Sequence, residues 1–98
     1  MKINKTIENN TTVISLEGRL DTITSPELSW ELDSLLDETK KLIFDLSKLD
    51  YISSSGLRVL LSAQKAMKDK GTMIVKNASE TVMEIFEITG FSDILTIE

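Results

Sequence analysis

Near the start of the chain, Ile3 and Ile7 lie in a polar background and a β-rich run follows them, a pattern that predicts two strands. Residues 11–18, TTVISLEG, are rich in β-branched and apolar residues, and Gly18 is expected to end the strand that they form. Asn9 and Asn10 come directly before this run and favour a hairpin turn. The stretch before the turn is therefore expected to be an edge strand.

A helical period begins near TSPEL. Pro26 suits a first helical turn, and Thr24 with Glu27 fits a capping box, although Ser25 competes as the N-cap. Trp30 lies off the apolar stripe, where it would cover a rim or form part of a contact surface. The stripe predicts one buried face and consists of Leu28, Leu32, Leu35 and Leu36.

The middle of the chain predicts a buried strand and a second helix. The continuous apolar run 42–44, followed by Leu46, fits a central strand that is buried on both faces. The helix is expected over about residues 55–70, with Gly71 at its C-terminal end. At the helical period one narrow side is polar, with Arg58, Ser62, Lys65 and Asp69. The opposite side is apolar, with Val59, Leu60, Ala63, Ala66 and Met67.

From Gly71 to the end of the chain, the pattern again predicts a strand, a helix and a strand in turn. GTMIVK predicts a short strand, a third helix is expected from about Ser79 to Thr89 before Gly90, and residues 94–97 are a candidate last strand. A chain of 98 residues is long enough for one core and too short for two. The expected fold class is α/β, a mixed sheet of four to five strands with three or more helices in a single small domain.

Composition narrows the possible partners. The chain has 11 Lys and Arg against 16 Asp and Glu, a formal net charge of −5. Nucleic-acid binding needs clustered basic residues, so no nucleic-acid partner is expected, and the acidic balance favours solubility. The N-terminal stretch MKINKTIENN lacks the apolar core of a signal peptide, and no segment approaches transmembrane length. We therefore expect a cytoplasmic protein without direct membrane insertion.

Catalysis is not expected. There is no cysteine and no histidine, which removes thiolate chemistry, the commonest general base and the commonest metal ligand. The stretch SSSGL lacks the first glycine of a nucleophile elbow, and no P-loop spacing occurs. Asp21, Asp45 and Asp50 do not follow the spacing of a known metal-binding loop. The sequence therefore predicts no metal site and no cofactor.

Three consecutive serines are the candidate for chemistry. Ser53, Ser54 and Ser55 fall between the end of the central strand and the start of the second helix. A helix N-terminus presents unpaired backbone N–H groups and about half a positive charge, so a phosphoryl group on a serine there would meet donors. The alternative is that a serine simply caps the helix. One cap needs one serine, and both interpretations stay open at this point.

Three segments, taken in order, resemble the STAS domain, the fold of bacterial anti-sigma factor antagonists. The central one is LIFDLSKLDYISSSGLRVLL, which has an apolar strand ending in Asp-Leu-Ser, a short loop, an aromatic residue, a serine pair and Gly-Leu before a helix. LEGRLDTITSPEL resembles the segment before the first helix, and VMEIFEITGFSDILTI resembles the last helix and closing strand. The resemblance covers almost the whole chain, so residues 1–98 are expected to form one STAS domain.

The resemblance implies a protein that binds and does not catalyse. Such antagonists bind an anti-sigma factor that is itself a serine kinase, and they release it once they are phosphorylated; a serine phosphatase resets them. The phosphorylated position falls on Ser54, and Asp45 matches a structural aspartate. The expected protein is a monomer or a weak dimer. The partner-binding positions implied are Asp21, Thr22, Ser53, Ser55, Gly56 and Arg58.

Two positions depart from the family pattern. Ser53 stands where the family's switches usually have Asp, and Arg58 stands where many members have Gly. The first change removes a carboxylate beside the phosphorylation site, and the second adds charge and bulk at the implied interface. The alternative function is a constitutive STAS scaffold, a subunit of a transport or signalling assembly in which Ser54 is never phosphorylated.

Overall fold

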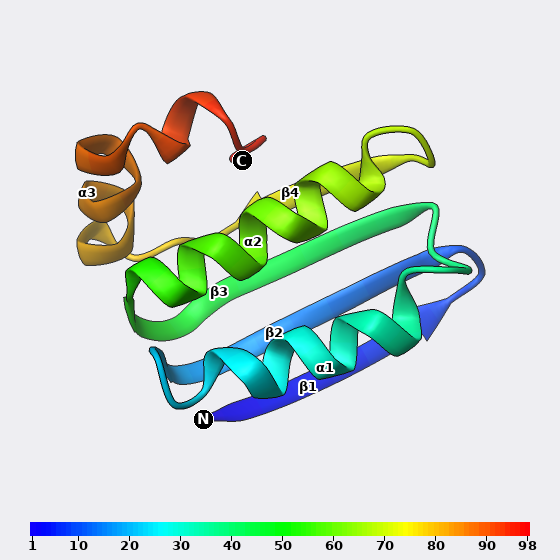
Figure 1. Ribbon diagram of the computed structural model, residues 1–98, viewed down its shortest axis with the longest axis horizontal. Helices are drawn as coiled ribbons and strands as arrows, with labels where there is room; N and C mark the ends of the chain where they lie inside the picture. The colour runs from blue at the N-terminus through cyan, green and yellow to red at the C-terminus, as the bar shows by residue number, and fades with distance from the viewer.

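The computed structural model describes residues 1–98 and confirms an α/β fold with four strands in one mixed sheet (Figure 1). The elements, in chain order, are β1 (Lys2–Glu8), β2 (Thr11–Leu20), α1 (Ser25–Leu35), β3 (Lys41–Ile52), α2 (Ser54–Met67), β4 (Thr72–Lys76), α3 (Glu80–Thr89) and the short 3-10 helix η1 (Phe91–Asp93). The strands lie in the order β1-β2-β3-β4; β1 is antiparallel to β2, and β2, β3 and β4 are parallel.

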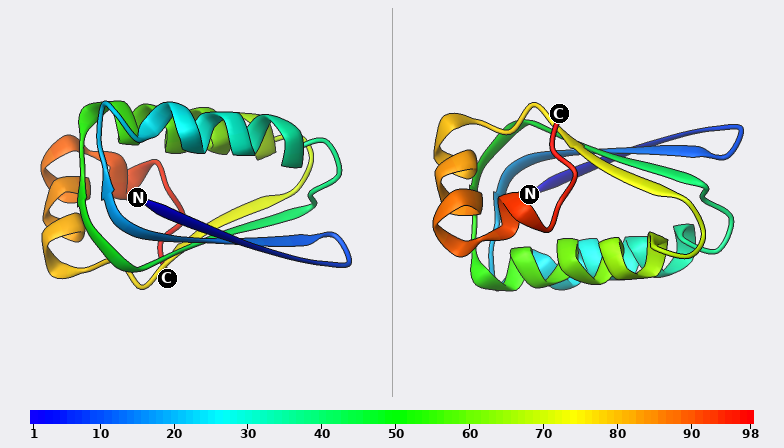
Figure 2. Two further views of the ribbon diagram at one scale, coloured as in Figure 1. Left: turned by 90° about the horizontal axis from the view of Figure 1, so that it is seen from below. Right: turned by 90° about the horizontal axis from the view of Figure 1, so that it is seen from above.

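Two helices cover one face of the sheet. Figure 2 shows α1 and α2 side by side on the same side of the strands, and α3 at the end where β3 leads into α2. Alternate side chains of β2 and of the first half of β3 enter the core, as a two-residue period requires. After Leu46 the buried positions of β3 are three residues apart. β2 and β3 contribute Ile14, Leu16, Leu20, Leu42, Phe44, Leu46, Leu49 and Ile52, and β4 contributes Met73 and Val75. The two helices add Leu28, Leu32, Leu57, Leu60, Ala63 and Met67.

The prediction that β3 is buried on both faces is wrong for the face away from these helices. Ile43 and Asp45 point to that side and are only half-buried, because α1 and α2 both pack on the other side. The strand is also longer than the apolar run suggested. It continues to Ile52 because β2 runs beside it as far as Leu20 and supplies hydrogen-bonding partners.

Gly18 does not end β2 as expected. Its φ is +107°, and the register of β2 against β3 shifts between Gly18 and Arg19. A left-handed backbone at a register shift is the geometry of a β-bulge, which glycine adopts without strain. The strand bends there and continues to Leu20.

The end of α2 also differs from the expectation. The helix ends at Met67, three residues earlier than predicted, and Ala66 is exposed. Gly71 is not a left-handed cap. A Cβ at Gly71 would lie 1.8 Å from the carbonyl oxygen of Lys40, which also accepts a 3.0 Å hydrogen bond from the Thr72 backbone N–H. Glycine is required there for a close approach between two loops.

The third helix forms as predicted, and the last strand is reduced to a single bridge. Ser79 caps α3, and Gly90 ends it with φ of +82°, a common C-terminal arrangement. Beyond η1 only Ile97 pairs with β4, opposite Val75. Leu95 is nonetheless buried, so the tail closes the core without forming a ladder.

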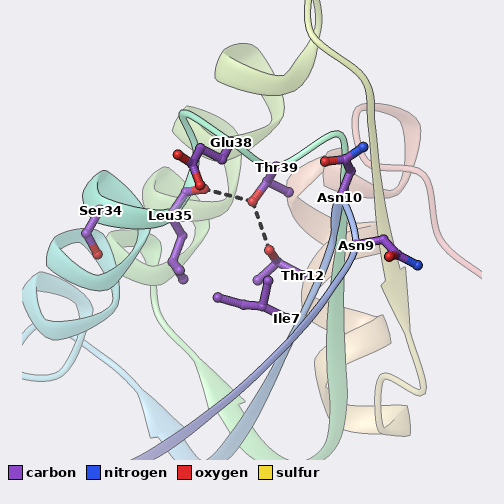
Figure 3. A pocket seen from close by; sticks show the side chains of 8 residues that line it. All are labelled: Ile7, Asn9, Asn10, Thr12, Ser34, Leu35, Glu38 and Thr39. Atoms are coloured by element: carbon purple, nitrogen blue, oxygen red, sulfur yellow. Dashed lines mark hydrogen bonds between the residues drawn. The ribbon is translucent and has the colours of Figure 1, made fainter.

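Two buried threonines, Thr12 on β2 and Thr39 after α1, form a hydrogen-bonded pair at the end of the sheet opposite the serines (Figure 3). The Thr12 and Thr39 hydroxyl oxygens lie 2.8 Å apart, and the Thr39 hydroxyl donates to the carbonyl of Leu35 at 2.8 Å. Thr12 is then the donor to Thr39. The pair lines a shallow hollow of about 190 Å³, and both hydroxyls are satisfied without solvent.

Candidate partner-binding site

Two loops meet at the carboxyl ends of β2 and β3. Because these strands are parallel, the loop after Leu20 and the loop after Ile52 emerge at the same end of the sheet (Figure 1). The Ser53 backbone N–H donates to the carbonyl oxygen of Leu20 at 2.8 Å. The Thr22 and Ser55 hydroxyl oxygens lie 3.4 Å apart. The structure therefore brings Asp21 and Thr22 to the serines, although about thirty residues separate them in sequence.

The three serines have three different environments. Ser53 is the N-cap of α2, and its side-chain oxygen accepts the Gly56 backbone N–H at 3.3 Å. Ser54 is the first residue of the helix, is exposed, and its hydroxyl takes part in no hydrogen bond within the chain. Ser55 is half-buried beside Thr22. Capping accounts for Ser53 alone, which leaves the Ser54 hydroxyl without a structural role.

Gly56 is buried beneath this turn. A Cβ at Gly56 would lie 2.8 Å from Cγ1 of Ile52 and 2.8 Å from Cγ of Leu20. Both neighbours are fully buried and cannot move aside. The geometry gives Gly56 a packing role, which is to let the first turn of α2 sit directly on the strand ends; its contact with a partner stays a prediction.

Asp21 organises the loop that enters α1. Its Oδ1 accepts the backbone N–H groups of Ile23 and Thr24, each at 3.0 Å, and the Thr24 hydroxyl at 3.1 Å. The hydrogen bond from the Thr24 backbone is the largest of several causes that hold the pKa of Asp21 below its ordinary value. Thr24 is the N-cap of α1, but its hydroxyl is directed to Asp21 and to the carbonyl oxygen of Arg19, 2.8 Å away, and makes no cap bond. The expected capping box is therefore absent, and Asp21 accepts the Thr24 backbone N–H in place of the Glu27 side chain.

Arg19 and Tyr51 form a link that the sequence did not reveal. The two residues are register partners on β2 and β3, and the Arg19 Cζ atom lies 4.5 Å from the centroid of the Tyr51 ring. Arg19 Nε also lies 3.8 Å from Asp21 Oδ2. A cation over an aromatic face is attracted to it. The pair ties the two loops together, and only the strand register could have identified it.

Arg58 lies close to the serines in sequence, whereas Asp45 lies well before the end of β3 where the two loops meet. Arg58 is exposed one turn after Ser54 and belongs to none of the chain's ion pairs. Asp45 lies within β3, where it accepts the Ser47 backbone N–H at 3.0 Å and the Asn77 side-chain amide at 3.2 Å. The Ser47 bond is the main cause that lowers the pKa of Asp45. Asp45 thus supports the strand.

No group of three or more His, Cys, Asp or Glu side chains converges in a way that could hold a metal ion. None of the helices has both the length and the apolar character needed to cross a membrane.

The chain is similar in sequence to the STAS domain and to anti-sigma factor antagonists. The sequence model of the STAS domain matches residues 2–98. The anti-sigma-B factor antagonist of Bacillus subtilis is 31% identical over 100 residues, which cover 99% of this chain and 92% of that one. BtrV of Bordetella bronchiseptica, provisionally named an anti-sigma factor antagonist, is 33% identical over 87 residues, 87% of this chain and 75% of that protein.

Solved structures agree on the fold. The anti-sigma factor antagonist SpoIIAA in its unphosphorylated form has a TM-score of 0.86 at 21% identity and covers 99% of this chain and 88% of its own. A sulfate transporter family protein from Wolinella succinogenes has a TM-score of 0.77 at 18% identity, covering 93% and 75%. Anti-sigma factor antagonists are not enzymes, in agreement with the prediction from the sequence. The matched family and the relatives at about 30% identity together place this chain in the STAS domain family, among the anti-sigma factor antagonists.

Proposed function

We propose that this chain binds an anti-sigma factor with serine kinase activity, and that phosphorylation of Ser54 ends the complex until a serine phosphatase restores it. One observation carries the proposal. Ser54 is exposed at the first position of α2, and its hydroxyl is used by nothing in the fold. A neighbouring serine already caps the helix.

The transfer itself makes modest demands on this chain. The kinase moves the γ-phosphoryl group of ATP onto the Ser54 Oγ, the hydroxyl proton leaves, and ADP is the other product. All catalytic groups belong to the kinase. This chain has only to present the Oγ without breaking a structural hydrogen bond, and Ser54 meets that condition where Ser53 does not.

The fold should tolerate the phosphate. A phosphoserine adds roughly −1.5 to −2 charge at neutral pH, and at the start of α2 it meets the positive end of the helix dipole. Arg58 lies one turn along and is free to approach it. Phosphorylation should therefore leave the domain folded.

Release of the partner then follows from the position of the added charge. The two loops at this end of the sheet present Thr22 and Ser55 beside the phosphate. A loss of about 3 kcal/mol of binding free energy lowers affinity more than a hundredfold, and one desolvated clash of like charges costs several kcal/mol. Electrostatic repulsion and bulk at the contact are sufficient, and no unfolding is needed.

The presence of Ser53 in place of the family's usual Asp should affect recognition by the kinase more than the stability of the fold. Ser and Asp are both good N-caps, so replacing the usual Asp by Ser keeps the cap and removes one negative charge beside the acceptor. We expect a kinase that does not require this carboxylate. The exposed guanidinium of Arg58 is expected to contact the partner directly.

The first test is the mass of the protein isolated from its native cells. Intact mass and peptide mapping over residues 48–65 should find a fraction that is heavier by one phosphoryl group, located on Ser54. Protein that stays unmodified under several growth conditions would favour the constitutive scaffold instead.

The second test separates release from unfolding. The binding probe is the purified ATP-binding serine kinase encoded beside this chain's gene; a permease in that place would favour the scaffold. Ser54→Asp should weaken binding at least tenfold while the melting temperature stays near that of the unmodified protein. Ser62→Asp, on the exposed side of the same helix, is the matched control and should bind normally. A large fall in melting temperature for Ser54→Asp would count against the mechanism.

A further inference from the structure

Two large apolar residues are exposed on α1 and in the turn that leads into it. Ile23 and Trp30 are 86% and 82% exposed. At about 100° per residue, Glu27, Trp30 and Ser34 of α1 fall within a sector of about 60°. Ile23 lies in the turn directly before the helix, and we call these four residues the α1 strip. The buried Leu28 and Leu32 face the sheet on the other side of the helix. Figure 2 shows no element of the chain over the outer side of α1.

The chain's acidic charge is concentrated around this strip. Residues 25–39 contain five acidic side chains and no Lys or Arg. The other 11 acidic residues are balanced by the 11 basic ones, so this segment carries the equivalent of the whole net charge of −5. Glu31 pairs with Lys5, whereas Glu27 and Asp33 belong to no ion pair.

The exposure of Trp30 does not serve solubility, because its side chain is large and apolar. Five large hydrophobic residues of the chain are exposed, and two of them share the α1 strip. Single exposed apolar residues are ordinary, but Trp is enriched among the residues that dominate binding energy at protein interfaces. An acidic rim around an apolar anchor is complementary to a basic surface that has an apolar pocket.

The strip is continuous with the serine site. Ile23 follows Thr22, whose hydroxyl lies 3.4 Å from that of Ser55. One surface therefore runs from the first turn of α2, through the loop after β2, onto the outer side of α1. A second copy of this chain is a poor occupant, because two acidic strips face to face would repel each other.

We propose that the α1 strip is a second part of the contact with the anti-sigma factor, in which Trp30 enters an apolar pocket on a basic surface of that protein. The inference rests on the proposed function and adds a specific anchor and a charge preference to it. Because Trp30 lies on α1 and Ser54 lies on α2, the contribution of Trp30 to binding should persist when the serine contact is altered.

Affinity measurements test the anchor. The probe is again the purified neighbouring kinase, and the variants are made in the full chain. Trp30→Ala should weaken binding about thirtyfold or more and leave the melting temperature nearly unchanged, because the side chain is exposed. Ile88→Ala is the matched control: Ile88 is 84% exposed on α3, off the strip, and should bind normally.

Salt dependence tests the rim. Binding by the unaltered chain should weaken as ionic strength rises, and the double variant Glu27→Gln, Asp33→Asn should bind more slowly and show a smaller salt effect. The matched control is Glu84→Gln on α3, which should change neither property. Equal salt effects in both variants would overturn the charge preference.

The outcomes separate the two proposals. If the kinase binds and Arg58→Ala weakens it while Trp30→Ala does not, the strip inference fails and the proposed function stands. If the unaltered chain does not bind the kinase, both fail. Sedimentation of the unbound chain addresses the remaining occupant: a dimer that Trp30→Ala dissociates would assign the strip to a second copy and overturn the inference.

Discussion

At the scale of single residues, three identical side chains in a row are distinguished only by their neighbours. Ser53 accepts a backbone N–H of the helix, Ser55 lies beside Thr22, and Ser54 has no partner in the chain. The sequence pointed to this run as a candidate site of phosphorylation, and the resemblance implied Ser54 as the proposed position. The hydrogen bonds show why capping does not compete with that assignment, since another serine supplies the cap.

The cap can be tested on its own. Ser53→Ala removes the acceptor of the Gly56 N–H and should lower the free energy of unfolding by about 1 kcal/mol. Ser53→Asp should keep most of the stability, because a carboxylate oxygen caps equally well. Urea denaturation of the three proteins compares them, with Ser54→Ala as a control that should change stability by less than about 0.5 kcal/mol. An equal loss in both alanine variants would contradict the assignment of the cap to Ser53.

The Asp21 loop predicts a dependence on pH. Its pKa is lowered, mainly by the hydrogen bond from the Thr24 backbone, so the folded state favours the ionised form. The resulting stability is present above the ordinary aspartate pKa of about 4 and is lost as pH falls through the lowered value. The difference in melting temperature between the unaltered chain and Asp21→Asn should therefore be largest near pH 7 and shrink below pH 4.

A control for general acid effects is Ser29→Ala, an exposed position of α1 without a titratable group. Its difference from the unaltered chain should be the same at every pH. A difference for Asp21→Asn that stays constant from pH 7 to pH 3 would show that the carboxylate's charge does not hold the loop.

At the scale of elements, the first turn of α2 depends on a missing side chain. Gly56→Ala would place a methyl group 2.8 Å from buried atoms of Ile52 and Leu20. We expect a net destabilisation of about 1–3 kcal/mol from overpacking, despite the better helix propensity of alanine. Ser62→Ala, on the exposed side of the same helix, gains propensity without a clash and should not destabilise. Calorimetry of both variants distinguishes the two effects, and a stabilised Gly56→Ala would contradict the close packing.

Glycines show which element boundaries can be predicted. Gly90 ends α3 as expected, because a left-handed cap is a local property of the helix end. The sequence also predicted that Gly18 ends a strand and that Gly71 ends a helix, and both glycines have other roles in the structure. The first permits a bulge whose register is set by β3, and the second permits contact with Lys40. Neither role is visible without the neighbouring segment.

At the scale of the whole molecule, the C-terminal tail closes the core with few backbone hydrogen bonds. Leu95 is 5% exposed although the tail makes only one bridge to β4. Leu95→Ala should lower the free energy of unfolding by about 2–4 kcal/mol, as for other buried leucines. Ile94→Ala is the neighbouring control, since Ile94 is 45% exposed, and should cost much less. Equal effects in denaturant titrations would show that the tail packs loosely.

The arrangement of charge also belongs to the whole molecule. A net charge of −5 describes the sequence, and one segment accounts for it. The fold then turns the outer side of that segment to solvent, beside the loop that carries Thr22. From its helical position, Trp30 was predicted either to cover a rim or to form part of a contact surface. Because its side chain is 82% exposed, it does not cover the core.

The sequence by itself determined the properties that depend on near neighbours. The helical periods, the β-rich runs, the hairpin at Asn9, the end of α3 at Gly90 and the motif around Ser54 all depend on residues close in sequence, so local pattern was enough. The tertiary structure alone decided the pairing of Arg19 with Tyr51, the face left open on β3, the close approach at Gly71 and the joining of Thr22 to Ser55. These depend on strand register and on the face that the helices cover, which bring together residues distant in sequence.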